Sequence, residues 1–165
     1  MYEESDIPNP STVYGKSKLL GEEIGFQVCP DNFKVIRTAS IFSKNSSFIR
    51  FLDKMIATDS KFDAYCDCIF SPTSINHLVN AIEKMINNDY KEKIFHVAGM
   101  PISRYEFAKI YYEINKGNIK NISKSENKNN IYLFKNLSLS TNKTDKILDC
   151  KSKDLNESLL KICKF

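Results

Sequence analysis

The chain has 165 residues, 42% of them hydrophobic and 12% aromatic, which is enough apolar material for the core of one domain. Its net charge of +4 comes from lysines spread along the chain, whereas a nucleic-acid surface would need a denser basic stripe. No apolar run approaches a membrane span and the acidic N-terminus is unlike a signal peptide, so we expect a cytoplasmic protein that binds neither nucleic acid nor membrane.

Five cysteines are an odd number without repeated spacing, which favours a reducing compartment over a disulfide framework. Cys66 and Cys68 are the one tempting pair of metal ligands, but a tetrahedral metal site needs further ligands that the sequence does not offer. We therefore expect core or surface thiols and no metal site.

The N-terminal third predicts a helix, a strand and a second helix. Ser11 or Thr12 can cap a helix that runs to about Val28, after an extended, proline-containing entry. The β-branched and aromatic segment Phe33–Arg37 predicts a strand. Apolar residues at helical spacing over 48–56 then predict an amphipathic helix.

The middle of the chain repeats this alternation. We expect a strand over 62–69, a turn and cap at 71–74, the strongest amphipathic helix of the chain over 75–86, and a strand over 93–97. Ser103 and Glu106 form a capping box before a helix that continues to Ile114.

The C-terminal part is more polar. Residues 116–130 are expected to form a long loop, 137–139 a short strand, and 141–148 and 155–162 two helices. Strands that alternate with helices predict an α/β fold with a largely parallel sheet, with the C-terminal region as a separate small lobe.

Tyr14 and Lys18 are the most suggestive polar residues, because residues four apart on a helix share one face. A free tyrosine has a pKa of about 10, and a fixed cation nearby favours its phenolate, so such a pair can act as an acid/base device. Arg37 at a strand end is a candidate site-lining residue. His96 is expected to be structural, and His77 to lie at the surface or beside a helix cap.

No combination of the five glycines spells a dinucleotide or phosphate cradle. Several segments nevertheless occur in an order that resembles the extended short-chain dehydrogenase/reductases, and among them the dTDP-4-dehydrorhamnose reductase branch, which includes the regulatory β subunit of methionine adenosyltransferase. The segments are Ile7-Pro8-Asn9-Pro10 with Tyr14-Gly15-Lys16-Ser17-Lys18 and Gly21-Glu22, Val35-Ile36-Arg37-Thr38, Ser71-Pro72-Thr73, Phe95-His96-Val97-Ala98-Gly99, Ser103-Arg104-Tyr105-Glu106-Phe107-Ala108 and Asn136-Leu137-Ser138-Leu139.

The resemblance implies that residues 1–165 are a single partial domain: the C-terminal part of a Rossmann-type reductase with its substrate-binding region, without the N-terminal nucleotide-binding half. Tyr14 would protonate a nucleotide-sugar carbonyl, and Lys18 would hold the nicotinamide ribose of NADP or NAD and lower the phenol's pKa. Tyr14, Lys18 and Arg37 would then contact the cofactor. The missing half or a homo-oligomer would be the partner, and the chain alone would be inactive, because the family's catalytic Ser or Thr precedes the tyrosine and Ser17 cannot replace it.

Two departures from the family pattern leave alternatives open. An aromatic residue commonly follows the Arg-Thr segment in the family, where this chain has Ala39-Ser40-Ile41-Phe42, and Leu133-Phe134 stands where the family has Arg-Pro. Losing that arginine removes a contact suited to phosphate or carboxylate. The chain is then alternatively a non-catalytic regulatory or sugar-nucleotide-binding module, or a fragment of a nucleotide-sugar epimerase or dehydratase.

Overall fold

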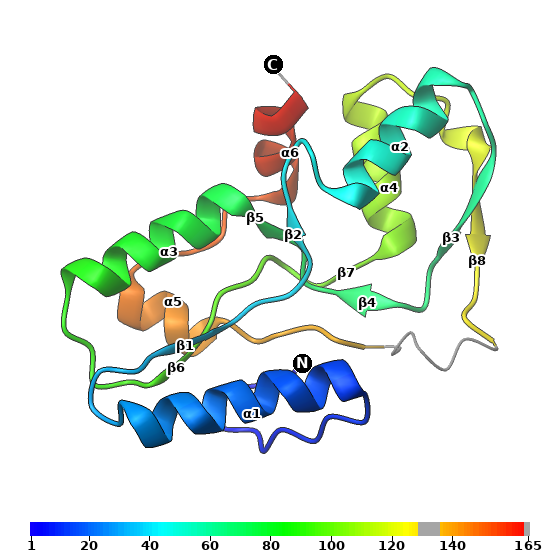
Figure 1. The fold of residues 1–165 in the computed structure, drawn as a ribbon. Coiled ribbons are helices and arrows are strands. Elements are labelled where there is room, and N and C mark those ends of the chain that lie inside the picture. Colours follow the sequence, from blue (N-terminus) through cyan, green and yellow to red (C-terminus); the bar gives the residue numbers. More distant parts are fainter. Residues whose placement is uncertain (129–135, 164–165) are drawn as a thin grey trace.

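Helices and strands alternate along the chain in a computed structural model that describes residues 1–128 and 136–163 (Figure 1). In chain order the elements are α1 (Val13–Val28), β1 (Val35–Arg37), β2 (Ile41–Phe42), α2 (Ser47–Ala57), β3 (Phe62–Tyr65), β4 (Ile69–Phe70), β5 (Thr73–Ser74), α3 (Ile75–Asn87), β6 (Ile94–His96), β7 (Ile102–Ser103), α4 (Arg104–Ile114), the 3₁₀ turn η1 (Ile119–Asn121), β8 (Ile122–Ser125), α5 (Asn142–Leu148) and α6 (Leu155–Cys163).

Most strand pairs are parallel. β1 pairs with β6, β2 with β5 and β3 with β8, all in parallel, while β4 and β7 are antiparallel. In the β1–β6 pair, Val35 lies opposite Ile94 and Arg37 opposite His96. Parallel strands need a crossover, and α2 and α3 lie on the chain between β1 and β6. The predicted α/β architecture with parallel strands is confirmed.

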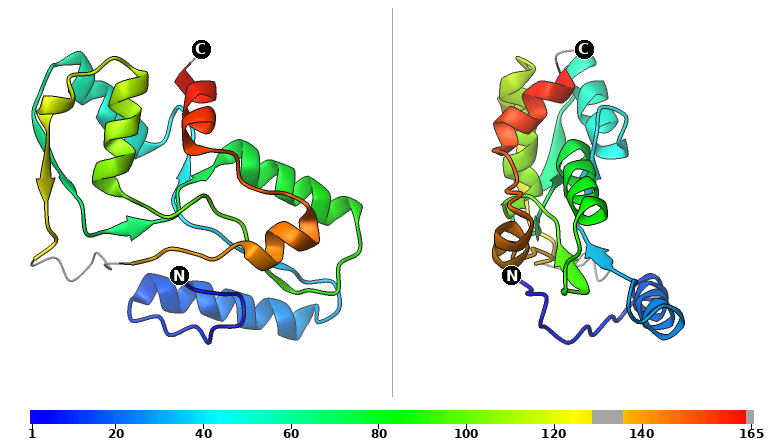
Figure 2. Two further views of the ribbon diagram at one scale, coloured as in Figure 1. Left: turned by 180° about the vertical axis from the view of Figure 1, so that it is seen from behind. Right: turned by 90° about the vertical axis from the view of Figure 1, so that its left-hand side faces the viewer.

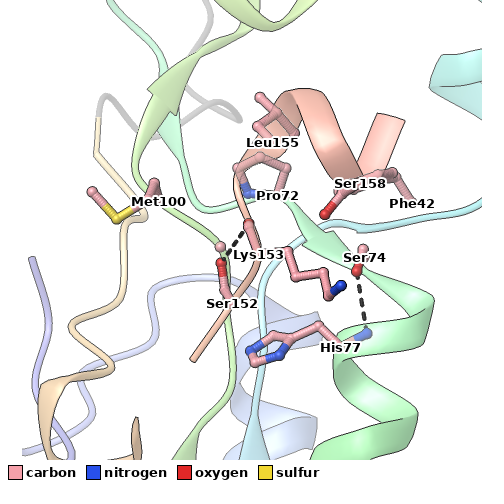
Figure 3. Close-up of a pocket in the computed structure, with 10 residues that line it drawn as sticks. Phe42, Pro72, Ser74, His77, Met100, Ser152, Lys153, Leu155 and Ser158 are labelled. Atoms are coloured by element: carbon pink, nitrogen blue, oxygen red, sulfur yellow. Dashed lines mark hydrogen bonds between the residues drawn. The ribbon is translucent and has the colours of Figure 1, made fainter. Parts of the chain in front are cut away.

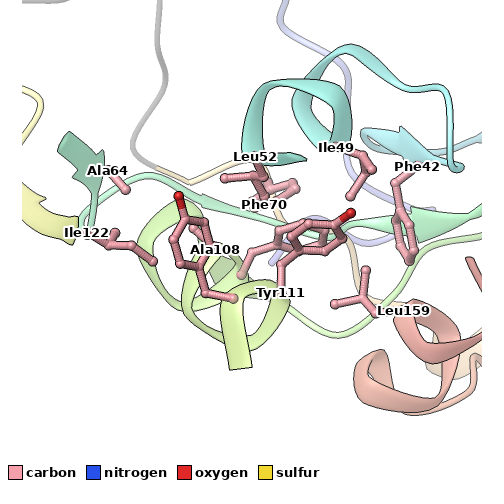
Figure 4. Packing of buried hydrophobic residues seen from close by; sticks show 11 residues of the cluster. Phe42, Ile49, Leu52, Ala64, Phe70, Ala108, Tyr111, Ile122 and Leu159 are labelled. Carbon is pink, nitrogen blue, oxygen red and sulfur yellow. The ribbon is translucent and has the colours of Figure 1, made fainter. Parts of the chain in front are cut away.

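Two hydrophobic clusters divide the fold into two lobes (Figures 1 and 2). One surrounds the fully buried Phe95 of β6 and includes side chains of α3 and α5. The other surrounds Phe107 of α4, whose ring centroid lies 5.6–5.8 Å from those of Phe42, Phe48 and Phe70. Figure 4 shows side chains of α2, α4 and α6 meeting there. This lobe draws on residues 42–163, so it is larger than the C-terminal lobe that we expected.

Helix starts follow the predicted caps. The caps accept a backbone N–H at 3.0–3.1 Å, in each case from the residue three positions later: Thr12 from Gly15, Ser74 from His77 and Ser103 from Glu106. These bonds satisfy N–H groups that have no partner within the helix. The predicted helices over the N-terminal, middle and C-terminal parts are confirmed with bounds shifted by at most two residues.

Three predicted elements differ from the structure. The single strand expected over 62–69 is two strands, β3 and β4, because the chain turns between them and each pairs with a different partner. The loop expected over 116–130 holds η1 and β8, which pairs with β3 and buries Ile122. The Lys and Ser residues of β8 give no strand signal in the sequence, and the strand is stabilised by its long-range pairing with β3. The strand expected over 137–139 is reduced to an isolated bridge between Leu139 and Tyr2.

Helix α1 is attached to the rest of the fold without burying any residue. Its Gly25 lies under the ring of Phe33, and a Cβ atom there would come within 2.1 Å of the Phe33 Cζ atom. Phe33 also stacks edge-on against Phe26, with ring centroids 5.3 Å apart. A side chain at position 25 would therefore have to displace the Phe33 ring, and this contact brings α1 close to the start of β1.

Two of the three glycines of α1, Gly21 and Gly25, make a matched test of this contact. Gly25→Ala should lower the free energy of unfolding by about 1–3 kcal/mol, because the methyl group overlaps the Phe33 ring. Gly21→Ala should raise it by about 0.5–1 kcal/mol, because no heavy atom lies within 4 Å of the added Cβ and alanine favours the helix. Urea unfolding measures both, and equal effects would contradict the proposed attachment.

Candidate functional site

Tyr14 and Lys18 lie together on an exposed face of α1. Lys18 Nζ lies 5.4 Å from the centroid of the Tyr14 ring, and the Tyr14 side chain is 73% exposed. An ammonium at this distance is attracted by the ring electrons, so the two groups are held near each other in the free chain. The structure brings this pair together as the spacing predicts, and its chemical role stays a prediction.

An ion pair fixes α1 against the end of β1. Glu22 accepts from Arg37 Nε at 3.0 Å and from Arg37 Nη2 at 2.7 Å, and both side chains are about one-fifth exposed. This two-bond geometry orients the helix as well as attracting it. Arg37 lies at the strand end as expected, but two of its three guanidinium nitrogens are already bound to Glu22.

The direction of α1 places Tyr14 and Lys18 beyond the strand. Figure 1 shows α1 running back beside β1 in the opposite direction. Tyr14 precedes Glu22 by eight residues, about 12 Å along the helix axis. Because Glu22 meets Arg37 at the carboxyl end of β1, Tyr14 and Lys18 project past that end, where ligands of open α/β sheets bind.

Buried hydrogen bonds join Thr73 to the segment 38–40 that follows β1. Thr73 donates its backbone N–H to the Ser40 carbonyl at 3.0 Å, and the Thr38 hydroxyl donates to the Thr73 hydroxyl oxygen at 3.1 Å. Ser71 and Thr73 are fully buried. These bonds attach residues 71–73 to the chain that leaves β1, on this side of the site.

The two histidines are both buried. His96 Nδ1 lies 3.1 Å from the Ser140 carbonyl oxygen. The backbone N–H of His96 donates to the Thr144 hydroxyl oxygen at 2.9 Å. The Thr144 hydroxyl in turn donates to Glu4 at 2.8 Å. His96 is buried in its strand, its Nε2 has no hydrogen-bond partner among the described residues, and its structural role stays a prediction. His77 lies beside its helix cap, as expected, but the surface alternative was wrong, because α3 turns its ring toward Cys150 in the core.

Among residues 1–128 and 136–163, no cluster of three or more His, Cys, Asp or Glu side chains could hold a metal ion. Cys66 and Cys68 flank a turn in which Asp67 accepts the Asn127 N–H at 2.9 Å.

Within the same described part, no helix is long and apolar enough to span a bilayer. Leu133 and Phe134, which depart from the family pattern, lie outside the described residues.

A family model described as the RmlD substrate binding domain matches residues 1–164. The chain belongs to this family. Among curated RmlD-family relatives it is 30% identical over 115 residues to a dTDP-4-dehydrorhamnose reductase of Mycolicibacterium smegmatis, covering 68% of this chain and 35% of the relative. It is 35% identical over 109 residues to the Bacillus subtilis spore coat polysaccharide biosynthesis protein SpsK, covering 65% of this chain and 38% of SpsK.

Solved structures agree with the RmlD-type fold. A dTDP-4-dehydrorhamnose reductase from Bacillus anthracis, in complex with NADP, superposes with a TM-score of 0.86 at 21% identity, over 99% of this chain and 58% of that one. A structure described as a hypothetical dTDP-4-dehydrorhamnose reductase, from Sulfolobus tokodaii, gives a TM-score of 0.77 at 32% identity, over 94% of this chain and 56% of that one. The chain therefore spans a little over one-third of the curated relatives and somewhat more than half of these structures.

Sequence reasoning missed two side chains that hold buried or half-buried partners in this structure. Glu22 was noted only as part of a family segment, although it follows Lys18 by one helical turn on the same face of α1. That spacing is a signal that could have indicated a basic partner on a neighbouring strand. Glu4 has no local signal, because its hydroxyl donor, Thr144, lies 140 residues away in the chain.

The buried histidines predict acid sensitivity. Burial lowers the pKa of His77, against a smaller opposing effect of Asp145, and burial lowers the pKa of His96, against Glu4. Their pKa values are thus lower in the folded than in the unfolded chain, where a histidine titrates near about 6.5. The unfolded state then binds more protons as the pH falls below that value, and folding stability is lost at up to about 1.4 kcal/mol per pH unit for each ring.

Urea unfolding between about pH 7.5 and 5.5 checks this, since ordinary carboxylates remain ionised over most of that interval. The unfolding midpoint should fall with pH in the parent chain and fall less in a variant with His77→Gln and His96→Gln. A midpoint that stays constant or rises on acidification would contradict the burial of neutral imidazoles.

Proposed function

We propose that the chain is the C-terminal, substrate-binding part of an NAD(P)-dependent nucleotide-sugar 4-keto reductase resembling dTDP-4-dehydrorhamnose reductase. The observation that carries this proposal is the placement of Tyr14 and Lys18 side by side, past the carboxyl end of β1, in a chain of the RmlD substrate-binding family. Five free cysteines fit the reducing, cytosolic setting that we propose for it.

In this proposal the Tyr14 hydroxyl donates its proton to the 4-keto oxygen of the sugar. The Lys18 ammonium stabilises the phenolate that remains and binds the ribose hydroxyls of the cofactor. A bound nicotinamide cofactor supplies the hydride for the carbonyl carbon. Tyr14 and Lys18 fit such a cofactor because both are exposed and neither is hydrogen-bonded through its side chain to another described residue. Arg37 retains only Nη1 for a cofactor contact, because Nε and Nη2 donate to Glu22.

The surface around β1 supports the proposal that a nucleotide-binding part completes the enzyme. Val35 donates its N–H to Lys93 and Arg37 accepts from Val97, so both face β6. By the alternation of a parallel ladder, the N–H and C=O of Ile36 face the opposite edge. The outer edge of β6 is instead covered, since His96 donates to Thr144. β1 therefore offers an edge to which a further parallel strand can add.

Two uncovered apolar stripes flank this edge. On α1, the exposed Val13, Leu20, Ile24 and Val28 recur at helical spacing along one side. On α3, the exposed Ile75, Val79, Ile82 and Ile86 do the same. α1 contacts β1 through Arg37, and α3 lies near Ile36, with which Ile82 and Ile86 line a shared surface hollow. We propose that this surface packs against the nucleotide-binding part, with a second copy of the chain as the alternative occupant.

A chimaera tests the catalytic proposal. The chain would replace the matching region of the Mycolicibacterium smegmatis reductase, and oxidation of NADPH by a 4-keto sugar nucleotide would be followed. The chain alone should give no turnover, whereas the chimaera should be active. Tyr14→Phe should lower kcat by about 10²–10⁴-fold, because the proton donor is removed.

Ser17→Ala is the matched control. Ser17 neighbours Tyr14 on the helix, and its hydroxyl donates to the Tyr14 carbonyl at 2.8 Å, so its loss should leave kcat close to that of the parent chimaera. Turnover by the isolated chain would contradict the incompleteness of the site. An active chimaera that tolerates Tyr14→Phe would favour the regulatory or binding module instead.

A further inference from the structure

A small cavity lies between the start of α3, the segment after β6 and the chain that enters α6 (Figure 3). Its volume is about 10 Å³, room for one water-sized oxygen atom. The polar side chains that line it are Ser74, His77, Ser152, Lys153 and Ser158. None of the described lining residues is acidic, and Lys153 is the one basic residue among them.

The surroundings of His77 are compatible with a proton on Nε2. Asn80 Nδ2 donates to Cys150 Sγ at 3.2 Å, and Cys150 Sγ lies 3.9 Å from His77 Nδ1. Burial raises the pKa of the Cys150 thiol, which therefore keeps its proton and can donate it to Nδ1. When the thiol donates in this way, the proton of the neutral His77 ring is on Nε2.

One buried nitrogen at this cavity lacks a partner. His77 Nε2 is buried and has no hydrogen-bond partner in the described part of the chain, and the residue is only 8% exposed. Ser158, equally buried, lines the same cavity. Leaving a buried donor unpaired costs about 1–3 kcal/mol, so a protonated Nε2 favours an acceptor in the cavity.

Two groups at the cavity carry positive charge: the N-terminus of α3 and the ammonium of Lys153. Ser74 is the N-cap of the 13-residue helix α3, whose dipole places partial positive charge at this end. The Lys153 side chain lines the cavity, and its ammonium also binds Glu157 at 2.8 Å. The Ser152 hydroxyl is already engaged, because it donates to the Lys153 carbonyl at 3.2 Å.

We propose that this cavity is a subsite for one anionic phosphoryl oxygen, which accepts from His77 Nε2–H and the Ser158 hydroxyl. The rest of the phosphoryl group would lie at the mouth, where Met100 is 75% exposed. Free phosphate and a nucleoside diphosphate share this chemistry. A nucleoside diphosphate is the source if the proposed function holds, and that assignment rests on it.

The two histidines of the chain make the test selective. Histidine labelled with ¹⁵N would be followed by NMR in the intact chain at about pH 7.5, where both rings are neutral, while inorganic phosphate or dTDP is added at constant ionic strength. The His77 signals should shift and saturate, while those of His96, buried elsewhere, should not. A shift with both ligands or with phosphate alone indicates that free phosphate suffices, and a shift with dTDP alone indicates a nucleotide-borne group.

Absence of a saturable His77 shift with either ligand would overturn the subsite and leave a water site. Ser158→Ala should weaken binding about tenfold, since one hydrogen bond to a charged group is lost. Ser152→Ala is the matched control and should change affinity little, because its hydroxyl already donates to Lys153. Equal effects of the two variants would also count against the subsite. These measurements report binding by the chain alone, so they can fail while the chimaera still turns over, and the reverse.

Discussion

The packing of α1 onto β1 is the contact on which the account of this site depends. α1 buries none of its residues, so its position rests on two small contacts: the Phe33 ring over Gly25 and the ion pair between Glu22 and Arg37. Both act on the face that also carries Tyr14 and Lys18. A shift of the helix by one residue would rotate it by about 100° and remove the pair from the strand end. The catalytic proposal therefore depends on contacts about two to three helical turns away from the proposed proton donor.

Much of the architecture was readable from local patterns. Helices α2 and α3 followed from apolar spacing, and the caps at Thr12, Ser74 and Ser103 followed from side chains that satisfy helix N–H groups. The Tyr14 and Lys18 pair was also predictable, because residues four apart on one helix meet whatever the rest of the fold does. These features share one property: the interacting groups are close in sequence.

The features that sequence reasoning missed all depend on contacts between distant segments. β8 exists because Ile122 pairs with Phe62, sixty residues earlier, and its polar neighbours gave no strand signal. Arg37 was predicted from its strand end to line the site, and its engagement by Glu22 depends on the angle at which α1 returns. His77 is buried because α3 turns it toward Cys150, which lies more than seventy residues later. A helical pattern shows which residues share a face, but not what that face meets.

Hydrogen–deuterium exchange, compared between the isolated chain and the same chain within an active reductase chimaera, tests most directly that this chain is one part of a larger α/β enzyme. The account predicts strong protection of the outward-facing Ile36 amide and of the α1 amides around Leu20 and Ile24 in the chimaera. Amides of the β3–β8 pair, which is complete in the chain itself, should exchange equally in both. Unchanged exchange at Ile36 and along α1 would contradict the account, because the edge of β1 and the uncovered side of α1 would then have no partner.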